Sequence, residues 1–470
     1  MRRTPVYFSL ALLLLVAALA LSFTSSSVQP VASAAGNQDY VLTATVWDAA
    51  QTQAVQNAGG TVKFSNKKSG IAVVSSENPN FLKQVMASGV ISTGAADQMV
   101  QWQMPSHEVA LEETSVTPGD ETFVNLQWNI KAIEAAGAWA AGYDGTGVRV
   151  AVIDGGIWNT HVDLVGRIDT ARSTSFVPGF AYNQDVGTFW HGTHVAGIIA
   201  ANDNAIGTIG VAPGATIVGV KALHNGSGSF GAVISAILYA ATPIADGGGG
   251  ADIINMSLGA TFPKGAGPGT GQLIGALNRA VNYAGDSNVL VISAAGNDGI
   301  DLDHSGSYTS VPAMSGSGLA ISATGPEGYA VGYPNGGTNF RDIASYTNYG
   351  NSIINLAAPG GDARLPGSAV CSIPRVPSGS VVNFCWVFDL VLSTSRGSGA
   401  STTSYSFAAG TSMAAPAAAG VAAIIKQRFP GISVGDLKAR LQNSADDEGK
   451  KGNDPFYGRG FVNARRAATE

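Results

Sequence analysis

The chain has 470 residues, of which 45% are hydrophobic and only 12% are charged, so it can bury a large core. Its net charge of −6 provides no basic surface for nucleic acid and disfavours an anionic membrane as a partner. The 61 glycines favour a fold with many tight loops over a helical bundle.

The N-terminus has the features of an export signal. Arg2 and Arg3 are followed by an apolar run at 10–21 and by Ala32-Ser33-Ala34, a small-x-small cleavage pattern. The run is shorter than the about 20 residues that span a bilayer, although an uncleaved anchor is the alternative. We expect residues 1–34 to be removed, leaving a secreted protein, extracellular or periplasmic, whose mature form has no membrane span.

Residues 35–117 have the pattern of a small α+β unit. The expected elements are strands at 40–46, 61–64, 70–74 and 99–102 and helices at 49–58 and 81–88. Their order, β-α-β-β-α-β, predicts a ferredoxin-like layout. The polar, acidic stretch 105–120 that follows is expected to be a linker.

Residues 118–470 alternate apolar strands with helices. Strands are expected at 148–153, 215–220, 252–256, 288–293 and 319–323, and helices at 130–139, 195–200, 234–241, 271–283 and 414–428. This alternation predicts an α/β fold, with a mostly parallel central sheet flanked by helices on both faces. Residues 365–403, rich in Ser, Gly and Pro, depart from the pattern and are expected to form a surface insertion.

The insertion contains the two cysteines of the chain, Cys371 and Cys385. An even pair in an exported protein predicts a disulfide, because export leads to an oxidising compartment. Two reduced core cysteines are the alternative.

Three short segments supply an acid, a base and a nucleophile in the order Asp, His, Ser. Asp154 follows a buried strand, where a carboxylate is costly unless it is paired. His191 precedes an apolar helix and is a candidate general base. Ser412 lies at the start of a helix, where its own N–H can point at a developing oxyanion.

Each of these residues also has a purely structural interpretation. Asp154 could cap a turn, His191 could be a satisfied core histidine, and Ser412 could cap its helix. His191 and His194 could share a metal, but no Glu follows the first His as it does in zinc proteases. The shared order of the three segments favours a serine hydrolase.

The segments VAVIDGG at 150–156, HGTHVAGIIA at 191–200 and GTSMAAP at 410–416 resemble, in order, the three signatures of the subtilisin-like serine proteases, or subtilases. The resemblance spans about residues 125–470. It implies a monomeric endopeptidase that hydrolyses protein or peptide substrates through an Asp154–His191–Ser412 triad and an acyl-enzyme. It also implies that Asn297 donates its side-chain amide to the oxyanion.

The same resemblance indicates the walls of a substrate groove. One edge segment is matched by Gly226, Ser227, Gly228 and Phe230, and the other by Ser257, Leu258 and Gly259. In the family these segments pair with extended substrate backbone. An ordinary Gly-Ser loop is the alternative for the first segment.

A structural, non-catalytic Ca²⁺ site is a further implication of the resemblance. The implied ligands are Asp163, Asn202, Asn204, Ile206 and Thr208, an oxygen-rich set that suits Ca²⁺. Val124 stands where a further side-chain ligand is expected. A solvated polar loop is the alternative.

Residues 35–117 resemble the family's propeptide, which assists folding and then inhibits. We expect self-cleavage between about Pro105 and Phe123, with the new end of the propeptide in the cleft. Gly155 and Ala417 depart from the family pattern, in which Ser or Thr and His are common at these places. The rival functions are an esterase or ligase with the same triad and an inactive subtilase-like binding protein.

Overall fold

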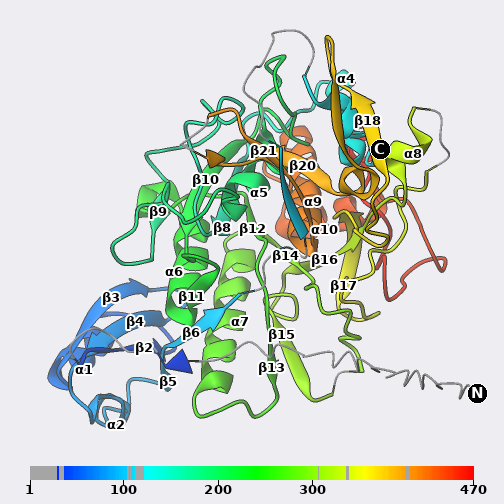
Figure 1. Ribbon diagram of the computed structural model, residues 1–470. Coiled ribbons are helices and arrows are strands. Elements are labelled where there is room, and N and C mark those ends of the chain that lie inside the picture. The colour runs from blue at the N-terminus through cyan, green and yellow to red at the C-terminus, as the bar shows by residue number, and fades with distance from the viewer. Residues whose placement is uncertain are drawn as a thin grey trace, which may run out of the picture.

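The computed structural model describes residues 29–30, 36–102, 105, 107–111, 121–304, 306–334, 338–398 and 402–470. Apart from β1 (Gln29–Pro30), the expected signal segment lies outside these residues, as does the part of the expected linker at 112–120. The described residues form a small N-terminal unit and a larger α/β unit that pack side by side (Figure 1). No helix among them is long and apolar enough to cross a membrane.

The centre of the larger unit is a seven-stranded parallel sheet. Its order is β17-β16-β14-β12-β8-β10-β9, and its strands are β8 (Arg149–Asp154), β9 (Thr174–Ser175), β10 (Thr216–Lys221), β12 (Ile253–Met256), β14 (Leu290–Ala294), β16 (Leu319–Thr324) and β17 (Ile354–Pro359). The expected parallel α/β fold and its strands are therefore confirmed. The chain builds outward from β8 in both directions, which opens a crevice at the carboxyl ends of the strands beside β8.

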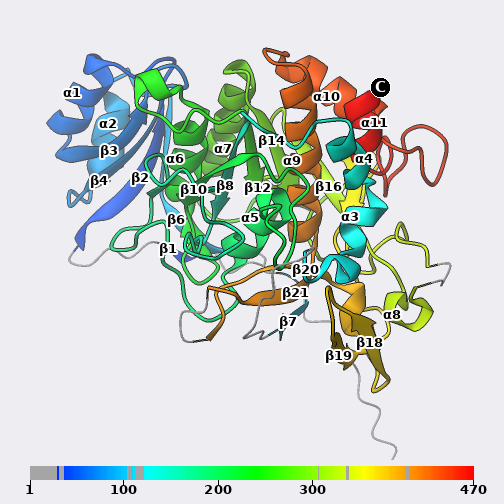
Figure 2. The same cartoon turned by 90° about the horizontal axis from the view of Figure 1, so that it is seen from above.

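Helices cover both faces of this sheet (Figure 2). α5 (His191–Ala200) and α9 (Thr411–Arg428) lie on one face, and α6 (Phe230–Ala241) and α7 (Thr270–Asp286) lie on the other. The residues of β8 alternate between the two cores, because successive strand side chains point to opposite faces. Val150 and Val152 join the α5/α9 core, and Ala151 and Ile153 join the α6/α7 core.

The small unit has the expected β-α-β-β-α-β order. It comprises β2 (Gln38–Thr43), α1 (Ala49–Asn57), β3 (Gly60–Asn66), β4 (Ile71–Ser76), α2 (Phe81–Ala87) and β5 (Thr93–Ala96), with the antiparallel sheet order β3-β4-β2-β5. α1 and α2 pack on one face, where Leu42 and Val55 meet. The opposite face, which includes Val41 and Val73, packs against α6 and α7, so the helices of the larger unit complete the small unit's core.

One expected strand of the small unit has a different partner. The residues expected at 99–102 form β6 (Gln98–Gln101), which pairs with β11 (Ser227–Ser229) of the larger unit and with β1. The fourth place in the small sheet is taken by β5. The prediction that residues 99–102 pair within the small sheet was wrong. An alternating pattern predicts a strand but does not predict which strand it pairs with.

Two further expectations need correction. The single helix expected at 130–139 is two helices, α3 (Trp128–Ala132) and α4 (Ala135–Ala140), because Glu134 between them adopts a left-handed φ of 55°. The insertion at 365–403 is only partly at the surface. It begins with the hairpin β18 (Val370–Pro374) and β19 (Ser380–Phe384), but β20 (Val391–Thr394) is fully buried.

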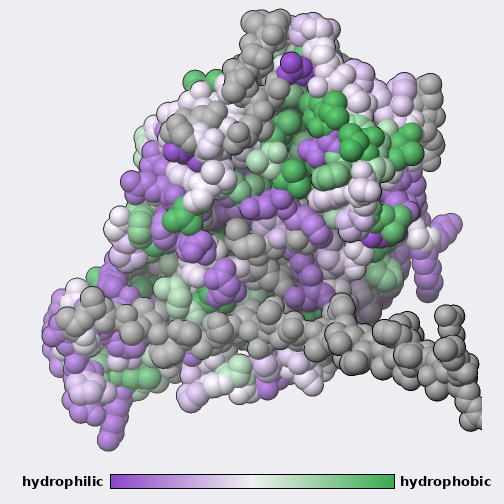
Figure 3. All heavy atoms as spheres, viewed as in Figure 1, coloured by the Kyte–Doolittle hydropathy of each residue, from purple (hydrophilic) through white to green (hydrophobic). Residues whose placement is uncertain are grey.

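Cys371 and Cys385 form a disulfide, as expected, at the base of the β18–β19 hairpin. Val370, Val382 and Phe384 of this hairpin are exposed, and apolar side chains gather on the same side of the molecule (Figure 3).

The remaining elements are β7 (His107–Leu111), β13 (Ala260–Pro263), β15 (Tyr308–Val311), β21 (Tyr405–Ala409), α8 (Tyr329–Gly332), α10 (Val434–Asn443), α11 (Ala464–Thr469), and the 3₁₀ turns η2 (Val124–Leu126), η3 (Ile244–Asp246) and η4 (Cys385–Asp389).

Candidate active site

The candidate catalytic residues come from the carboxyl edge of the central sheet. Asp154 is the last residue of β8, Ser257 follows β12, and Asn297 follows β14. His191 is the first residue of α5, and Ser412 is the second residue of α9. Neighbouring parallel strands end at the same edge, so residues far apart in the sequence meet there.

Asp154 and His191 form a buried pair. Nδ1 of His191 lies 2.8 Å from Oδ2 and 3.0 Å from Oδ1 of Asp154. A carboxylate only accepts hydrogen bonds, so Nδ1 carries the ring proton and Nε2 offers a lone pair. Nε2 is buried and has no hydrogen-bond partner among the described residues. This leaves the ring ready to accept a proton at Nε2.

The surroundings of His191 favour its protonated form. Burial lowers the pKa of His191, but the charge of Asp154 and its hydrogen bond raise it, with smaller increases from Asp185 and Glu108. The net pKa lies above the ordinary value for histidine. A base with a raised pKa binds a proton more strongly in the transition state, but it must be neutral before it can act.

His194 has a different environment. Its Nε2 lies 2.9 Å from the carbonyl oxygen of Ser406, and burial lowers its pKa to about 3. It is therefore a neutral core histidine bonded away from His191. No group of three or more His, Cys, Asp or Glu side chains in the described part of the chain is arranged to hold a metal ion.

Ser412 is held by a reciprocal contact with Ser257. The Ser412 hydroxyl donates to the Ser257 carbonyl at 3.2 Å, and the Ser257 hydroxyl donates to the Ser412 carbonyl at 2.7 Å. In this rotamer the Ser412 hydroxyl is not bonded to His191, and catalytic hydrogen bonds commonly tighten only with substrate bound. The N–H of Ser412 belongs to the first turn of α9, where backbone donors have no partner within the helix.

Asn297 is oriented by the residue before Ser412. Its Oδ1 accepts hydrogen bonds from the Thr411 N–H at 2.9 Å and from the Thr411 hydroxyl at 2.8 Å. Both donors occupy the oxygen, so the Nδ2 amide faces the other way. A Cβ placed on Gly410 would lie 3.3 Å from that Nδ2, so the amide stands directly beside the approach to Ser412.

The glycine after Asp154 makes room for a second carboxylate. A Cβ on Gly155 would overlap Oδ2 of Asp185, so neither Ser nor Thr fits there without displacing it. The Gly155 N–H instead donates to Asp154 at 2.6 Å. Lys221 is buried nearby, 4.0 Å from Asp185. The Asp185 carboxylate thus fills the space that a Ser or Thr side chain would occupy at position 155.

The chain itself lies along the expected groove. β6 pairs antiparallel with β11, with Val100 opposite Gly228 and Gln101 opposite Ser227. The Trp102 N–H donates to the Gly226 carbonyl at 3.0 Å, and its indole N–H donates to Gly228 at 3.1 Å. Trp102 also meets the ring of Phe230 edge-on at 5.8 Å between centroids. All four expected residues of this groove wall therefore contact β6 or Trp102. On the other wall, Ser257, Leu258 and Gly259 are buried between β12 and β13.

Beyond Trp102 the chain passes Ser412 and continues on the other side. A Cβ on Gly410 would lie 3.3 Å from Cα of Pro105. β7 then pairs antiparallel with β21, from His107 opposite Ala409 to Leu111 opposite Tyr405. β21 leads directly into Gly410 and α9. β6 and β7 therefore lie on the two sides of the candidate nucleophile, and Pro105 lies between them beside Gly410.

Comparisons with known proteins agree with this geometry. The sequence model of the subtilase family matches residues 145–460. The chain is 35% identical to M-protease of Shouchella clausii (strain KSM-K16), over 73% of this chain and 70% of that protein. It is 34% identical to subtilisin Savinase of Lederbergia lenta, over 73% of this chain and 98% of that protein.

The chain belongs to the subtilase family. It is a subtilisin-like serine endopeptidase. Its fold also matches the solved structure of the epidermin leader peptide processing serine protease of Staphylococcus aureus, with a TM-score of 0.66 at 21% identity. That match covers 92% of this chain and 99% of the other, so the shared fold includes the small unit.

In this subtilase, the loop expected to hold Ca²⁺ lies beside a buried carboxylate. Asp163 receives the Thr208 N–H on Oδ2 at 2.9 Å, whereas its Oδ1 is buried with no hydrogen-bond partner among the described residues. Burial raises the pKa of Asp163 to about 7. A buried carboxylate oxygen without a partner fits a hard cation. The Asn202 N–H donates to the backbone carbonyl of Asp163, and the Ile206 N–H donates to Oδ1 of Asn204.

Sequence reasoning missed Glu121, which contacts this loop from a distant part of the sequence. Its carboxylate accepts the N–H groups of Asn204 at 2.8 Å and Ala205 at 2.9 Å. Val124, where a ligand was expected, lies in η2. The available signal was Glu121 itself, an acidic residue three positions before Val124. A short insertion or deletion can move a ligand by a few positions relative to the family pattern. Trp102 and Asp185 were also missed, since nothing local in the sequence links them to the site.

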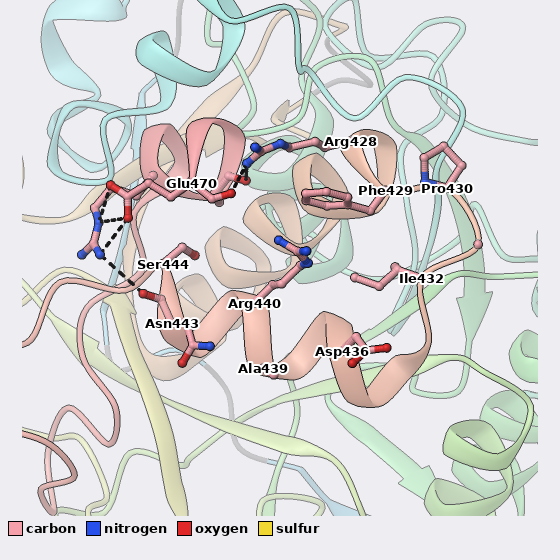
Figure 4. A pocket seen from close by; sticks show the side chains of 13 residues that line it. Arg428, Phe429, Pro430, Ile432, Asp436, Ala439, Arg440, Asn443, Ser444 and Glu470 are labelled. Atoms are coloured by element: carbon pink, nitrogen blue, oxygen red, sulfur yellow. Dashed lines mark hydrogen bonds and ion pairs between the residues drawn. The ribbon is translucent and has the colours of Figure 1, made fainter.

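A separate surface pocket of about 940 Å³ lies between the C-terminal end of α9, one side of α10, and α11 (Figure 4). Arg440 stacks over the Phe429 ring at 3.8 Å, and Arg428 bonds the Glu470 carbonyl at 2.6 Å. None of its lining residues belongs to the candidate active site.

Proposed function

We propose that this subtilase is a secreted endopeptidase in which Asp154, His191 and Ser412 act as a triad. The Ser412 oxygen attacks the scissile carbonyl while His191 Nε2 takes its proton, and Asp154 stabilises the resulting imidazolium. His191 then donates that proton to the leaving amine, and the acyl-enzyme remains. Water then attacks the acyl-enzyme while His191 takes its proton, and His191 returns that proton to the Ser412 oxygen as the ester bond breaks and the acid leaves. The observation that carries the proposal is the buried Asp154–His191 pair, whose Nε2 has no other partner among the described residues.

The oxyanion is held by two donors. The Nδ2 amide of Asn297 faces the approach to Ser412, and the Ser412 N–H opens α9. In subtilisin, loss of an asparagine donor of this kind reduces kcat by about 10²–10³, and a loss of the same order is expected for Asn297→Ala.

We further propose that the small unit is a propeptide that the enzyme removes itself. The chain crosses the candidate nucleophile between Trp102 and His107, so the first cut falls among the bonds joining these two residues. This interval overlaps only the start of the one expected from the sequence, and most of the remainder, 112–120, lies outside the described residues. Removal of residues 1–34 as a signal peptide precedes this step.

A Ca²⁺ ion would be held by Asp163, with Asn202, Asn204, Ile206, Thr208 and Glu121 as the surrounding oxygen donors. It would stabilise this loop and take no part in the reaction. Chelation is then expected to lower the thermal midpoint of the processed enzyme while leaving kcat unchanged below that midpoint.

The Ser412→Ala variant tests the central proposal. Loss of the nucleophile is expected to reduce kcat about 10⁶-fold and to leave the precursor uncut. A fluorophosphonate probe should label the wild-type protein and not the variant. Full processing of the purified variant, with no other protease present, would refute the triad assignment.

A further inference from the structure

β7 covers an edge of β21 that has no other strand partner among the described residues. The sheet order is β20-β21-β7. Ser404 bonds Ser395 on the β20 side, with an N–O distance of 2.8 Å, and strand residues alternate between their two neighbours. Tyr405, Phe407 and Ala409 therefore direct their backbone groups toward β7. Without β7, this edge offers open donors and acceptors to any extended peptide.

Apolar side chains fix β7 on this edge. Val109 and Leu111 pack against the main core of the larger unit, and the ring of His107 meets Trp386 at 6.2 Å between centroids. These three residues alternate along the strand and share one face. Glu108 and Ala110, on the other face, are exposed. His107 is exposed and Val109 and Leu111 are half-buried, so β7 docks on this edge through two half-buried apolar side chains.

The proposed first cut leaves β7 attached to the larger unit. The bonds to be cut precede His107, whereas β7 continues through residues 112–120 to Glu121, which is bonded to the Asn204 loop. Phe123 packs against the ring of Tyr405 at 5.0 Å between centroids, and Tyr405 is also the residue paired with Leu111. Leu111 and Phe123 thus both contact Tyr405 of β21. The proposed cut therefore frees only the upstream end of β7.

A short tether maintains a high local concentration of the strand. Linkers of this length give effective concentrations in the millimolar range, and β7 adds five paired residues and two packed apolar side chains to that advantage. The small unit has no such tether after the cut and can leave by dilution. The two products of one cleavage therefore differ in how they are retained.

We propose that β7 remains on β21 after self-cleavage and occupies the leaving-group side of the substrate groove. This inference rests on the proposed function. The enzyme then hydrolyses peptides with a small leaving group such as 4-nitroaniline, which need no contact with β21. It hydrolyses polypeptides poorly, because their residues beyond the scissile bond compete with β7 for the same edge.

Two substitutions on β7 test this inference. Val109→Asp puts a charge on the packed face, and Ala110→Asp puts the same charge on the exposed face as a matched control. The readout is kcat/KM for an internally quenched peptide with five residues beyond the cut, divided by kcat/KM for the 4-nitroanilide with the same upstream sequence. We expect this ratio to rise about tenfold in Val109→Asp and to stay at the wild-type value in Ala110→Asp. An unchanged ratio in both variants overturns the inference.

Hydrogen exchange on the wild-type enzyme keeps the test decisive if Val109→Asp fails to fold. The amides of Tyr405, Phe407 and Ala409, which face β7, should stay protected after self-cleavage, as in the uncut Ser412→Ala precursor. Loss of that protection, or a processed N-terminus beyond Leu111, contradicts the inference. Neither result affects the proposed function, whose failure would appear instead as absent 4-nitroanilide hydrolysis and absent fluorophosphonate labelling.

Discussion

The two strands on either side of Ser412 are held by different means. β6 carries Val100 and leads into Trp102, both 0% exposed, and belongs to a unit whose sheet packs on α6 and α7. β7 is only half-buried but remains covalently joined to the larger unit. After the proposed cut, packing alone would retain β6, whereas β7 would also stay covalently joined to the larger unit. If the proposed cut occurs, one segment would yield a dissociable inhibitor on one side of Ser412 and a retained strand on the other.

Removing the indole that follows β6 should have the largest effect on this contrast. Trp102 is fully buried and bonds Gly228, and truncation of a buried Trp costs about 3–5 kcal/mol. Trp102→Ala should therefore weaken retention of the cut small unit about 10²–10³-fold or more. Activity recovered on dilution of processed enzyme measures this. Met99→Ala, an exposed change on β6, serves as the control, and equal retention in both variants would contradict the packing argument.

Asp97 should make retention of the small unit depend on pH. Its carboxylate accepts the Gly231 N–H at the start of α6 at 3.0 Å, and burial raises its pKa from 3.8 to about 6. The docked state therefore binds a proton more strongly than the free unit does. Docking is strongest below pH 4 and weakens as the pH rises toward about 6, by up to about 100-fold.

Asp97→Asn tests the assignment of this pH dependence. An amide does not titrate, so retention of the small unit in the variant should be flat from about pH 4 to about pH 7. Retention would be followed through activity released on dilution at each pH, using a 4-nitroanilide and correcting for the pH profile of the fully separated enzyme. A wild-type slope that persists in Asp97→Asn would assign the dependence to another group.

The smallest expected effect concerns the negative charge of Glu108, which β7 places near His191. Glu108 is one of the groups that raise the pKa of His191. Activity requires neutral His191, so it is lost as the pH falls through that raised pKa. If β7 stays in place, Glu108→Gln should move this acid limb to lower pH, because the variant removes a negative charge that favours protonated His191. The 4-nitroanilide kcat/KM profile measures it, and an unshifted limb would mean that β7 has left the site.

Much of the fold could be predicted because its signals are local. The strand at 148–153 is a run of β-branched and small apolar residues, and β8 occupies almost the same span. The cysteines pair as expected because they lie close in sequence across one hairpin. The prediction of one helix at 130–139 was wrong because Glu134 adopts a left-handed conformation. Such a break is usually predicted from a glycine, and the residue here is a glutamate.

The partner of a strand is not a local property. β6 has the same alternating pattern as the strands of the small sheet, and only the folded chain decides that it pairs with β11. The same holds for Asp185, which fills the space that Gly155 leaves, and for Glu121, which reaches the Asn204 loop across 83 residues of sequence. These contacts depend on long-range packing, which a sequence pattern does not specify.

The sequence by itself determined the family, the parallel α/β sheet and the identity of the candidate acid, base and nucleophile, because each rests on a short segment whose chemistry is contained within it. Only the tertiary structure decided that the chain crosses its own candidate site, with β6 on β11 and β7 on β21. The reason is physical: hydrogen-bonding groups on a strand edge are the same for every sequence, and which strand satisfies them depends on what the rest of the fold brings alongside.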